Sequence, residues 1–288
     1  MVQTLSQKRK PSASTWWAGD PTSEAQVDQK SGSLLAAILT IAAVPVAAQW
    51  LNYPTPGIPR LPDGKPDLAA PVPRKPDGRP YLSGIWKGVP RNQNFVRNLG
   101  VDLKPGEFPI RPWAEALTAE RMTDAGQKEQ PPAHCLPPGI PILDAAGAGY
   151  PLKIIQEPAL VVILYEAMGT FRQVFLDART LPKDSNPTWM GYSIGRWDGD
   201  TLVTDTAGFN GKMWLDLSGH PSTDALYITE RFQRRDFGHL DLQLTIDDPK
   251  AYTKPWTVRE SWQIFPGTEL LEYVCNENEK DVKHMVGK

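Results

Sequence analysis

The amino-acid sequence predicts a mainly β protein: an antiparallel meander closed as a barrel, with a proline-rich extended N-terminal arm and one short helix. Short segments rich in β-branched and aromatic residues follow one another from residue 150 onward, separated by turn clusters. The 29 prolines, 23 glycines and 10 tryptophans among 288 residues argue against a mainly helical protein. Strands at this spacing are typical of a barrel or of a β-sandwich, which is the alternative fold.

The expected strands are short and are punctuated by turn signals such as Asp198-Gly199-Asp200. Residues 239–246 alternate polar and apolar side chains, which predicts one wet face and one buried face. Eight or nine strands after residue 150 are enough to close a barrel without open edges. Strands are expected at 82–88, 153–156, 160–166, 171–177, 190–197, 201–206, 227–235, 240–246, 257–264 and 270–274.

One helix is expected, at residues 111–124. Pro112 suits the first turn because the N–H group that proline lacks has no partner there in any case. Trp113 and Leu117 lie four residues apart and therefore share a helical face. Gly126 is able to end the helix because glycine adopts the left-handed conformation of a C-terminal cap.

Residues 49–80 are expected to form the extended arm, which carries an internal repeat. The stretch Arg60-Leu-Pro-Asp-Gly is matched by Arg74-Lys-Pro-Asp-Gly, 14 residues later. Pro-Asp-Gly is a turn signal because proline fixes φ and glycine supplies a positive φ. Since 20 of the 29 prolines lie from Pro45 to Pro151, the proline excess belongs to this arm and to the loop-rich first half. Residues 81–288 are expected to form a single β-rich domain.

Residues 1–48 are predicted to be a signal peptide with a long N-terminal extension. A basic cluster at residues 8–10 precedes the apolar run Leu34–Ala48, which ends in small residues. Pro45 interrupts this run, which is shorter than the ~20 residues of a membrane span. We therefore expect a periplasmic or secreted protein that meets the membrane only through this segment. An uncleaved anchor is the alternative, and the true start codon is left open.

The charge balance excludes one class of function. With 31 basic and 33 acidic side chains, the formal net charge is −2, so a strongly basic nucleic-acid binder is excluded and no nucleic-acid partner is expected.

The two cysteines, Cys135 and Cys275, both follow the predicted signal peptide. An even count in an oxidising compartment predicts one disulfide between them, and a reactive thiol beside His134 is the alternative.

The sequence predicts neither a metal site nor a cofactor, because its histidines and cysteines lack the spacing of zinc ligands. Gly191-Tyr-Ser-Ile-Gly195 matches the G-x-S-x-G pattern of serine nucleophiles, but that motif requires a helix after the serine. A hairpin signal follows instead, which favours a glycine-flanked barrel strand. His220 lies in a long connection between strands, the kind of segment that often carries function.

Charged residues on apolar strand faces are the strongest functional signal. Arg172 shares its face with Val174, and Glu230 and Glu260 also share faces with large apolar residues. A charge inside an apolar interior is costly unless it is paired. Two interpretations are open. In the structural one, the barrel contains an Arg–Glu pair, or a bulge changes the register of a strand. In the functional one, these side chains form a polar spot that orients a ligand or acts as an acid or base.

Several stretches form a recognisable set: residues 52–68, 83–86, 196–203, 245–257 and 272–278. Together they resemble a family of uncharacterised predicted secreted bacterial proteins. The resemblance covers about residues 50–288 and implies export and a single β-rich domain, without an activity, a cofactor or a catalytic residue. The strand count and the Gly-x-Trp pattern of the first strand also resemble the lipocalin-like (calycin) barrels, an analogy of fold that does not fix function.

The function predicted from the sequence is an exported barrel that binds a small apolar or aromatic molecule in its mouth. The alternative is a cofactor-independent hydrolase, lyase or isomerase with Glu230 or Glu260 as the acid or base and His220 on a lid. A second alternative is an envelope interaction protein that docks through its arm. The ligand, the reaction and the oligomeric state are not predicted. The expected ligand-binding residues are Arg172, Glu230, Glu260, Trp189, Tyr192 and Trp262.

Overall fold

The computed structural model describes residues 55–89, 98–104, 106–144, 150–184, 186–275 and 277. The chain separates into two compact units, Met1–Ala47 and Ala48–Lys288, and the first unit, with the predicted signal peptide, lies outside the described residues. The described elements are β1 (Gly84–Gly88), α2 (Pro112–Arg121), α3 (Asp124–Gln127), η1 (Pro131–His134), β2 (Leu152–Gln156), β3 (Leu160–Tyr165), η2 (Ala167–Gly169), β4 (Thr170–Phe175), β5 (Tyr192–Asp198), β6 (Thr201–Ala207), β7 (Tyr227–Arg234), β8 (His239–Asp247) and β9 (Trp256–Ile264).

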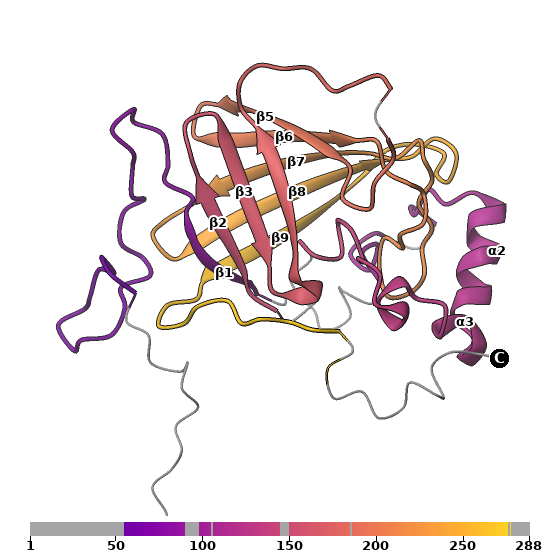
Figure 1. Cartoon of the computed structure of the whole chain (residues 1–288), viewed down its shortest axis with the longest axis horizontal. Helices are drawn as coiled ribbons and strands as arrows, with labels where there is room; N and C mark the ends of the chain where they lie inside the picture. The colour runs from indigo at the N-terminus through magenta and orange to yellow at the C-terminus, as the bar shows by residue number, and fades with distance from the viewer. Residues whose placement is uncertain are drawn as a thin grey trace, which may run out of the picture. The chain divides into compact units, whose positions relative to one another are not determined.

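The strands form a closed barrel in which each strand pairs with the next one in the sequence (Figure 1). β1 completes the ring by pairing with β9. All neighbours are antiparallel except β4 and β5, which are parallel and pair only through Val174–Ser193 and Phe175–Ile194. The predicted mainly β barrel is therefore confirmed and the sandwich alternative is wrong. The meander was predicted to be antiparallel throughout, and the parallel pairing of β4 and β5 shows that this part of the prediction is wrong.

The predicted strands agree with the observed ones to within two residues at each end, except for residues 270–274. This segment is not a strand, because β1 and β9 already close the ring and leave no edge for it to join. Instead, the backbone N–H of Leu271 donates to the Glu166 carboxylate at 2.9 Å, and the Tyr273 ring packs edge-on against Tyr150.

The helix expected at 111–124 is shorter than predicted and is followed by a separate single turn. Thr123 separates the two, because its side chain accepts a hydrogen bond from the backbone N–H of Gly126 and so caps the start of α3. Gly126 therefore lies inside α3 and does not end α2, which stops at Arg121. No helix in the described part of the chain is long and apolar enough to cross a membrane.

The described residues between 98 and 144, which we call the cap, lie over one end of the barrel (Figure 1). The cap is attached to the main chain of the β8–β9 connection. The backbone N–H of Arg111 donates to the carbonyl oxygen of Ala251, and the indole N–H of Trp113 donates to that of Lys250, each at 2.9 Å. The ring of Phe108 lies edge-on against Trp256, with 5.0 Å between ring centroids. These contacts close this end of the barrel with protein side chains.

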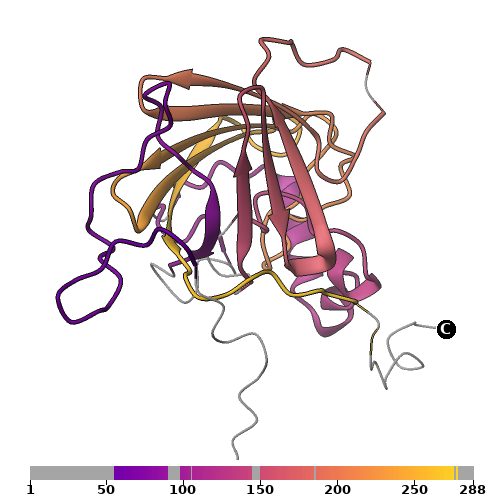
Figure 2. The ribbon, with the colours of Figure 1, turned by 60° about the vertical axis from the view of Figure 1, so that its left-hand side comes forward.

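The described part of the arm lies at the opposite end (Figures 1 and 2). Each copy of the repeat folds into the same turn, in which an arginine Nη1 donates to a glycine carbonyl: Arg60 to Gly64 at 2.6 Å and Arg74 to Gly78 at 2.8 Å. Both glycines have the positive φ that the Pro-Asp-Gly pattern predicts, 84° and 81°. Two main-chain hydrogen bonds from the turn at residues 235–238 then hold the arm against the barrel.

The interior of the barrel is apolar along β8 and largely apolar elsewhere. The leucines and the isoleucine of β8 are buried, and the polar residues between them are half-buried, which confirms the predicted alternation. The same two-residue period places Ile228 and Phe232 of β7 and Val258 and Trp262 of β9 inside. Polar groups therefore stand out where they occur on these inner faces.

Cys135 and Cys275 form the predicted disulfide, which joins the cap to the C-terminal segment. The reactive-thiol alternative is therefore wrong. The two cysteines are 140 residues apart in the sequence, so the bond closes a very long loop.

Replacing both cysteines by alanine should lower the free energy of unfolding by about 4–5 kcal/mol, because a cross-link over a long loop mainly restricts the unfolded chain. Urea denaturation of the oxidised protein and the double variant measures this loss. Reduction with dithiothreitol should destabilise the parent by a similar amount and leave the variant unchanged. Equal midpoints for the parent and the variant would contradict the prediction.

Candidate functional site

The inner face of β4 carries a buried arginine, Arg172, whose relative exposure is 2%. The alternation of β4 places Val174 on the same inner face, while Phe171 and Gln173 face outward. Because β5 lies next to β4 across the short parallel pairing, the guanidinium extends from β4 toward β5, β6 and β7. The sequence-predicted polar spot therefore lies where the barrel has its shortest ladder among the described strands.

Each N–H group of the Arg172 guanidinium has an acceptor. Nε donates to Ser193 Oγ at 2.9 Å, and Nη2 donates to Thr206 Oγ1 at 2.8 Å. Glu230 accepts from Nη1 at 3.0 Å and also from Nη2. Nη1 makes a longer contact, 3.3 Å, with Asp144 Oδ2. We call these five residues, together with Tyr165 and Thr204, the Arg172 cluster.

Asp144 reaches the cluster from the cap rather than from a strand. Tyr165 of β3 donates its hydroxyl hydrogen to Asp144 Oδ1 at 2.7 Å. Trp262 of β9 donates its indole N–H to the main-chain oxygen of Asp144 at 2.9 Å. Glu230 has a third donor besides the guanidinium, the hydroxyl of Thr204 at 2.7 Å. The side chains of Asp144, Arg172 and Glu230 are all essentially inaccessible to solvent.

Burial and the shared cation separate the two carboxyl groups. Burial raises the pKa of Asp144 well above its ordinary value, and the negative charge of Glu230 raises it further. Burial acts in the same direction on Glu230, but the charge of Arg172 and the hydrogen bonds with Arg172, Asp144 and Thr204 together outweigh it and lower the pKa of Glu230. Burial and the neighbouring Asp144 raise the pKa of the Tyr165 hydroxyl. The cluster is thus an Arg172–Glu230 ion pair beside a carboxyl group that favours its neutral form.

Three of the residues predicted to bind a ligand come together here: Arg172, Glu230 and Trp262. Glu260 lies on the inner face of β9, two residues before Trp262, and is buried with a relative exposure of 2%. The structure therefore places all three charged candidates inside the barrel, as their shared parity with apolar neighbours suggested. Arg172 and Glu230 form the Arg–Glu pair that the structural interpretation expected, and no bulge interrupts the described ladders at these positions. The interpretation as a polar spot that orients a ligand stays a prediction.

The other two aromatic candidates lie elsewhere. Trp189 belongs to the connection before β5, where it is partly buried against the apolar core. Tyr192 lies outside the barrel, stacked on Phe175 with 5.3 Å between ring centroids, and its hydroxyl accepts a hydrogen bond from Arg179 at 2.8 Å. The structure does not bring Trp189 or Tyr192 to the Arg172 cluster. Tyr192 begins β5 beside the turn at Gly191, so its outward direction could not be assigned without the register.

His220 lies in the connection between β6 and β7 and pairs with Asp216, with 2.5 Å between Nδ1 and Oδ2. The same carboxylate accepts from the backbone N–H groups of Leu99 at 2.9 Å and Ser218 at 3.0 Å. The ring of Phe108 covers the imidazole edge-on at 4.6 Å. His220 thus helps to join the cap to the β6–β7 connection. It has no contact with Glu230, which is paired with Arg172.

The serine of the G-x-S-x-G pattern is part of a barrel strand, as the hairpin interpretation predicted. Ser193 contacts Arg172 Nε and Thr206 Oγ1, each at 2.9 Å, and not a histidine. The second glycine of the pattern, Gly195, has a steric reason, because a Cβ there would lie 2.7 Å from the Leu176 side chain. This glycine permits the close approach of β4 and β5.

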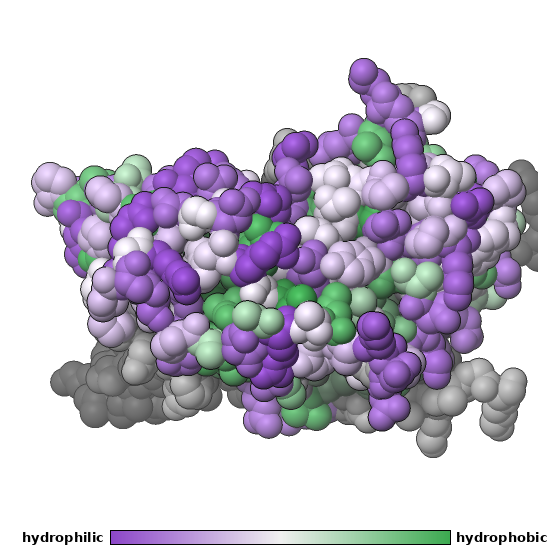
Figure 3. Space-filling view, turned by 90° about the horizontal axis from the view of Figure 1, so that it is seen from above, coloured by the Kyte–Doolittle hydropathy of each residue, from purple (hydrophilic) through white to green (hydrophobic). Residues whose placement is uncertain are grey.

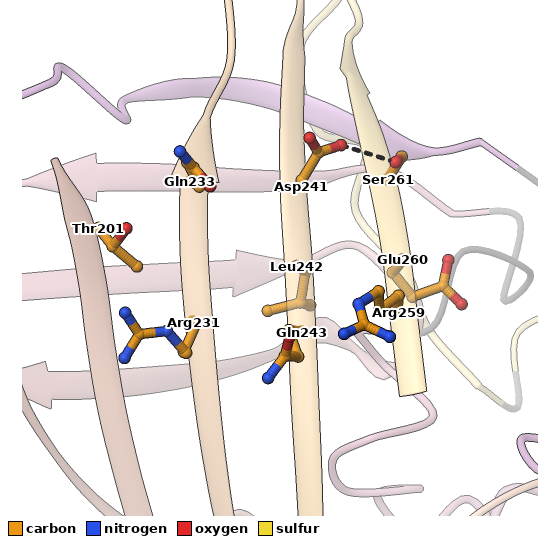
Figure 4. A pocket seen from close by; sticks show the side chains of 9 residues that line it. All are labelled: Thr201, Arg231, Gln233, Asp241, Leu242, Gln243, Arg259, Glu260 and Ser261. Atoms are coloured by element: carbon orange, nitrogen blue, oxygen red, sulfur yellow. Dashed lines mark hydrogen bonds between the residues drawn. The ribbon is translucent and has the colours of Figure 1, made fainter. Parts of the chain in front are cut away.

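A depression of about 340 Å³ lies on the outer face of β6 to β9 (Figure 4). Its walls are mostly polar, and Ser261 donates to Asp241 across it at 2.8 Å. Glu260 and Arg259 leave β9 in different directions, so the Glu260 carboxylate faces away from this depression (Figure 4). One face of the molecule is largely hydrophilic, with hydrophobic side chains gathered near its middle (Figure 3). The depression is lined by Thr201, Arg231, Gln233, Asp241, Leu242, Gln243, Arg259, Glu260 and Ser261.

Sequence reasoning missed the other members of the cluster. Tyr165, Thr204 and Thr206 share the parity of buried apolar neighbours on β3 and β6, and this signal was present in the sequence. Asp144 gave no such signal, because a loop has no period. Within the described residues, no three histidine, cysteine, aspartate or glutamate side chains lie together as ligands for a metal ion. The chemistry available here is hydrogen bonding, charge pairing and a buried acid.

No protein-family description matches this chain, and no curated protein matches it in sequence. A solved structure that matches is that of a secretary abundant heat soluble (SAHS) protein from Ramazzottius varieornatus, at 12% sequence identity. The match covers 64% of this chain and 95% of that chain, with a TM-score of 0.30. A likeness of this size adds nothing to what the geometry indicates about function.

Replacing Arg172 by methionine should lower the free energy of unfolding by about 3–5 kcal/mol, because it leaves Glu230 buried without its cation. The double variant Arg172→Met/Glu230→Gln should lose less than the sum of the two single variants, since neither charge is then left alone. Urea denaturation measures each value. Arg231→Met, in the exposed pair with Asp198, is the control and should cost less than about 1 kcal/mol. Strictly additive losses at Arg172 and Glu230 would contradict the prediction.

Asp144 should make stability fall as the pH rises. Its folded-state pKa is raised, so its stabilising contribution is complete below the unfolded pKa and is lost as the pH climbs toward the folded value. Asp144→Asn keeps the shape and does not titrate. The free energy of unfolding of the parent, relative to this variant, should decline by up to about 1.4 kcal/mol per pH unit, beginning above about pH 4. Chemical denaturation from pH 3 upward tests this, and a relative stability that rises with pH contradicts it.

Proposed function

We propose that this protein is exported and that its barrel binds a small apolar or aromatic molecule, with the Arg172 cluster as the polar anchor. The observation that carries the proposal is the buried cluster of charged and hydroxyl groups inside a largely apolar barrel. Small-molecule sites have this composition, with apolar walls and a few placed polar groups. Folding alone gives little reason for it, since buried ion pairs are often replaceable by apolar residues without loss of stability.

The molecule would bind at the capped end of the interior. Asp144 belongs to the cap and is the member of the cluster that no strand supplies. Because Arg172, Glu230 and Asp144 are buried, a molecule would reach them only if part of the cap moved. Glu260 and Trp262, on the same inner face of β9, would then lie beside it. Binding of a small molecule inside a closed barrel is the feature that this proposal shares with the lipocalin-like resemblance.

Export is supported by the Cys135–Cys275 disulfide, a bond typical of oxidising compartments. The proposed organisation is a signal peptide at 1–48, an arm at 49–80 and a β-rich domain from 81.

The described arm residues bind this chain's own barrel, so no contact favours a separate docking partner. No contact favours a hydrolase, lyase or isomerase either, since Glu230 is held by Arg172 and His220 by Asp216.

Protein purified from its own host under non-denaturing conditions should carry a small molecule. Native mass spectrometry should show a mass above that of the denatured chain, and the denatured sample should release the difference. The stripped protein should then bind 1-naphthol, followed by tryptophan fluorescence.

Two variants place the binding inside the barrel. Ile163→Phe fills the interior beside Arg172 and should weaken 1-naphthol binding at least about tenfold, since core space tolerates added volume poorly. Phe171→Ser changes an exposed side chain of the same pair of strands and should leave binding unchanged. Equal native and denatured masses together with no 1-naphthol binding would rule out the proposed function.

A further inference from the structure

The contacts that hold the arm on its own barrel leave out the first copy of its repeat, residues 59–67. They are made by Thr55 and by residues 68–82, which include the second copy, residues 73–81. In the described part of the chain, every hydrogen bond and ion pair of residues 59–66 stays within the first copy. Figures 1 and 2 agree: the second copy lies beside the β5–β6 turn, whereas the first copy projects away from the strands.

The second copy shows what this turn can bind. Its Arg74 donates from Nη1 and Nη2 to the two carboxylate oxygens of Asp200, at 2.9 and 2.6 Å. The guanidinium of Arg79 lies over the ring of Trp197, 5.8 Å from the centroid. Asp200 and Trp197 both belong to the tip of the β5–β6 hairpin. The second copy therefore holds a hairpin tip through one carboxylate and one aromatic ring.

The first copy has the same internal geometry and no such partner. Three backbone hydrogen bonds close each turn, and they match in position and in length, at 2.9, 2.9 and 2.8 Å. Arg60 corresponds to Arg74, and each donates to the carbonyl oxygen of the glycine four residues on. Arg60 is thus placed on the same turn as the arginine that binds Asp200, but no carboxylate among the described residues pairs with it.

A hollow of about 520 Å³ lies beside the first copy. Pro66 and Leu68 form part of its wall and are only partly buried. The equivalent positions of the second copy are Pro80 and Leu82, and both of these are buried. The first copy therefore leaves open an apolar contact that the second copy has closed.

The charges around the hollow favour an acidic partner. Residues 87–89 and 263–266 form its barrel side, and most of these side chains are apolar. Two lysines, Lys65 and Lys87, line the hollow, and no acidic residue does. The ammonium group of Lys87 lies 5.3 Å from the centroid of the Phe265 ring. An aromatic side chain with a carboxylate beside it matches both the apolar wall and the two cations.

We propose that the first copy of the repeat and the adjacent hollow dock a partner protein through a hairpin tip that carries an aspartate and an aromatic residue. The aspartate binds the Arg60 guanidinium, and the aromatic ring enters the hollow below Lys65. The partner is a different protein, because the hairpin tip of this chain is already held by its own Arg74. The arm thereby links the barrel to a second protein, whatever the barrel interior binds.

A cyclic peptide with the sequence of residues 196–203 tests this on the full chain. Arg196 and Val203 are paired in the hairpin, so joining them keeps its shape. Fluorescence anisotropy of the labelled peptide should show binding at least about fivefold tighter than that of the same peptide with Asp200→Asn, because a bidentate pair with arginine is charge-assisted. Arg60→Met in the chain should abolish this preference, and Arg231→Met, in an exposed pair on β7, should keep it.

A second pair of variants tests the hollow. Gln263 lies on the outer face of β9 and lines the hollow, so Gln263→Trp fills the space and should weaken peptide binding about tenfold. Gln243→Trp makes the same change on the outer face of β8, away from the hollow, and should bind the peptide like the parent. Equal urea midpoints for the two variants show that both barrels are intact.

Each outcome decides the proposal. A preference for the aspartate peptide that needs Arg60, together with weaker binding to Gln263→Trp alone, supports it. Equal affinity for the two peptides, or a preference that Arg74→Met abolishes and Arg60→Met does not, overturns it. It is also overturned if free indole-3-propionate binds the hollow as tightly as the peptide, since the site then takes small molecules. Arg60→Met should leave 1-naphthol binding unchanged, so this proposal and the proposed function fail independently.

Discussion

Closure of the barrel depends on the contact between β4 and β5. These parallel strands pair through two residues each, whereas β3 and β4 pair through six. A ladder this short gives few of the hydrogen bonds that hold neighbouring strands together. Arg172 supplies further connections from the inside, because it donates from β4 to Ser193 on β5 and to Glu230 on β7. The stacked rings of Phe175 and Tyr192 connect the same two strands on the outside.

This way of closing the barrel gives its interior two different sides. The side formed by β4 to β7 contains a guanidinium, a carboxylate and several hydroxyl groups, all with partners. The side formed by β8 and β9 is built largely of leucine, valine and tryptophan. A buried charge is tolerated only with its full set of hydrogen bonds, which explains why Arg172 and Glu230 lie among several hydroxyl groups. Glu260 is the charged residue on the inner face of β9. A molecule inside such a barrel would be oriented by this asymmetry.

The two-residue period of a strand explains what could be predicted from the sequence. It placed Arg172, Glu230 and Glu260 on inner faces before any contact was known, because each shares its parity with apolar neighbours. Asp144 could not be found in this way, since it lies in an irregular segment whose direction depends on packing. The parallel direction of β5 was missed for a related reason. A strand pattern gives the faces of a strand but not which way it runs beside its neighbour.

A buried acid that favours its neutral form is a costly choice for a group with only a structural role. Asparagine has the same shape and does not titrate, and an apolar residue would need no partner, so stability alone does not explain Asp144. In the absence of an aspartate, Tyr165 and Arg172 Nη1 would each retain a buried donor without an acceptor. Asp144 satisfies both donors, and its carboxyl group also hydrogen-bonds with Glu230. This one side chain therefore ties the cap to the ion pair inside the barrel, and the polar groups of the cap, β3, β4 and β7 are satisfied together or not at all.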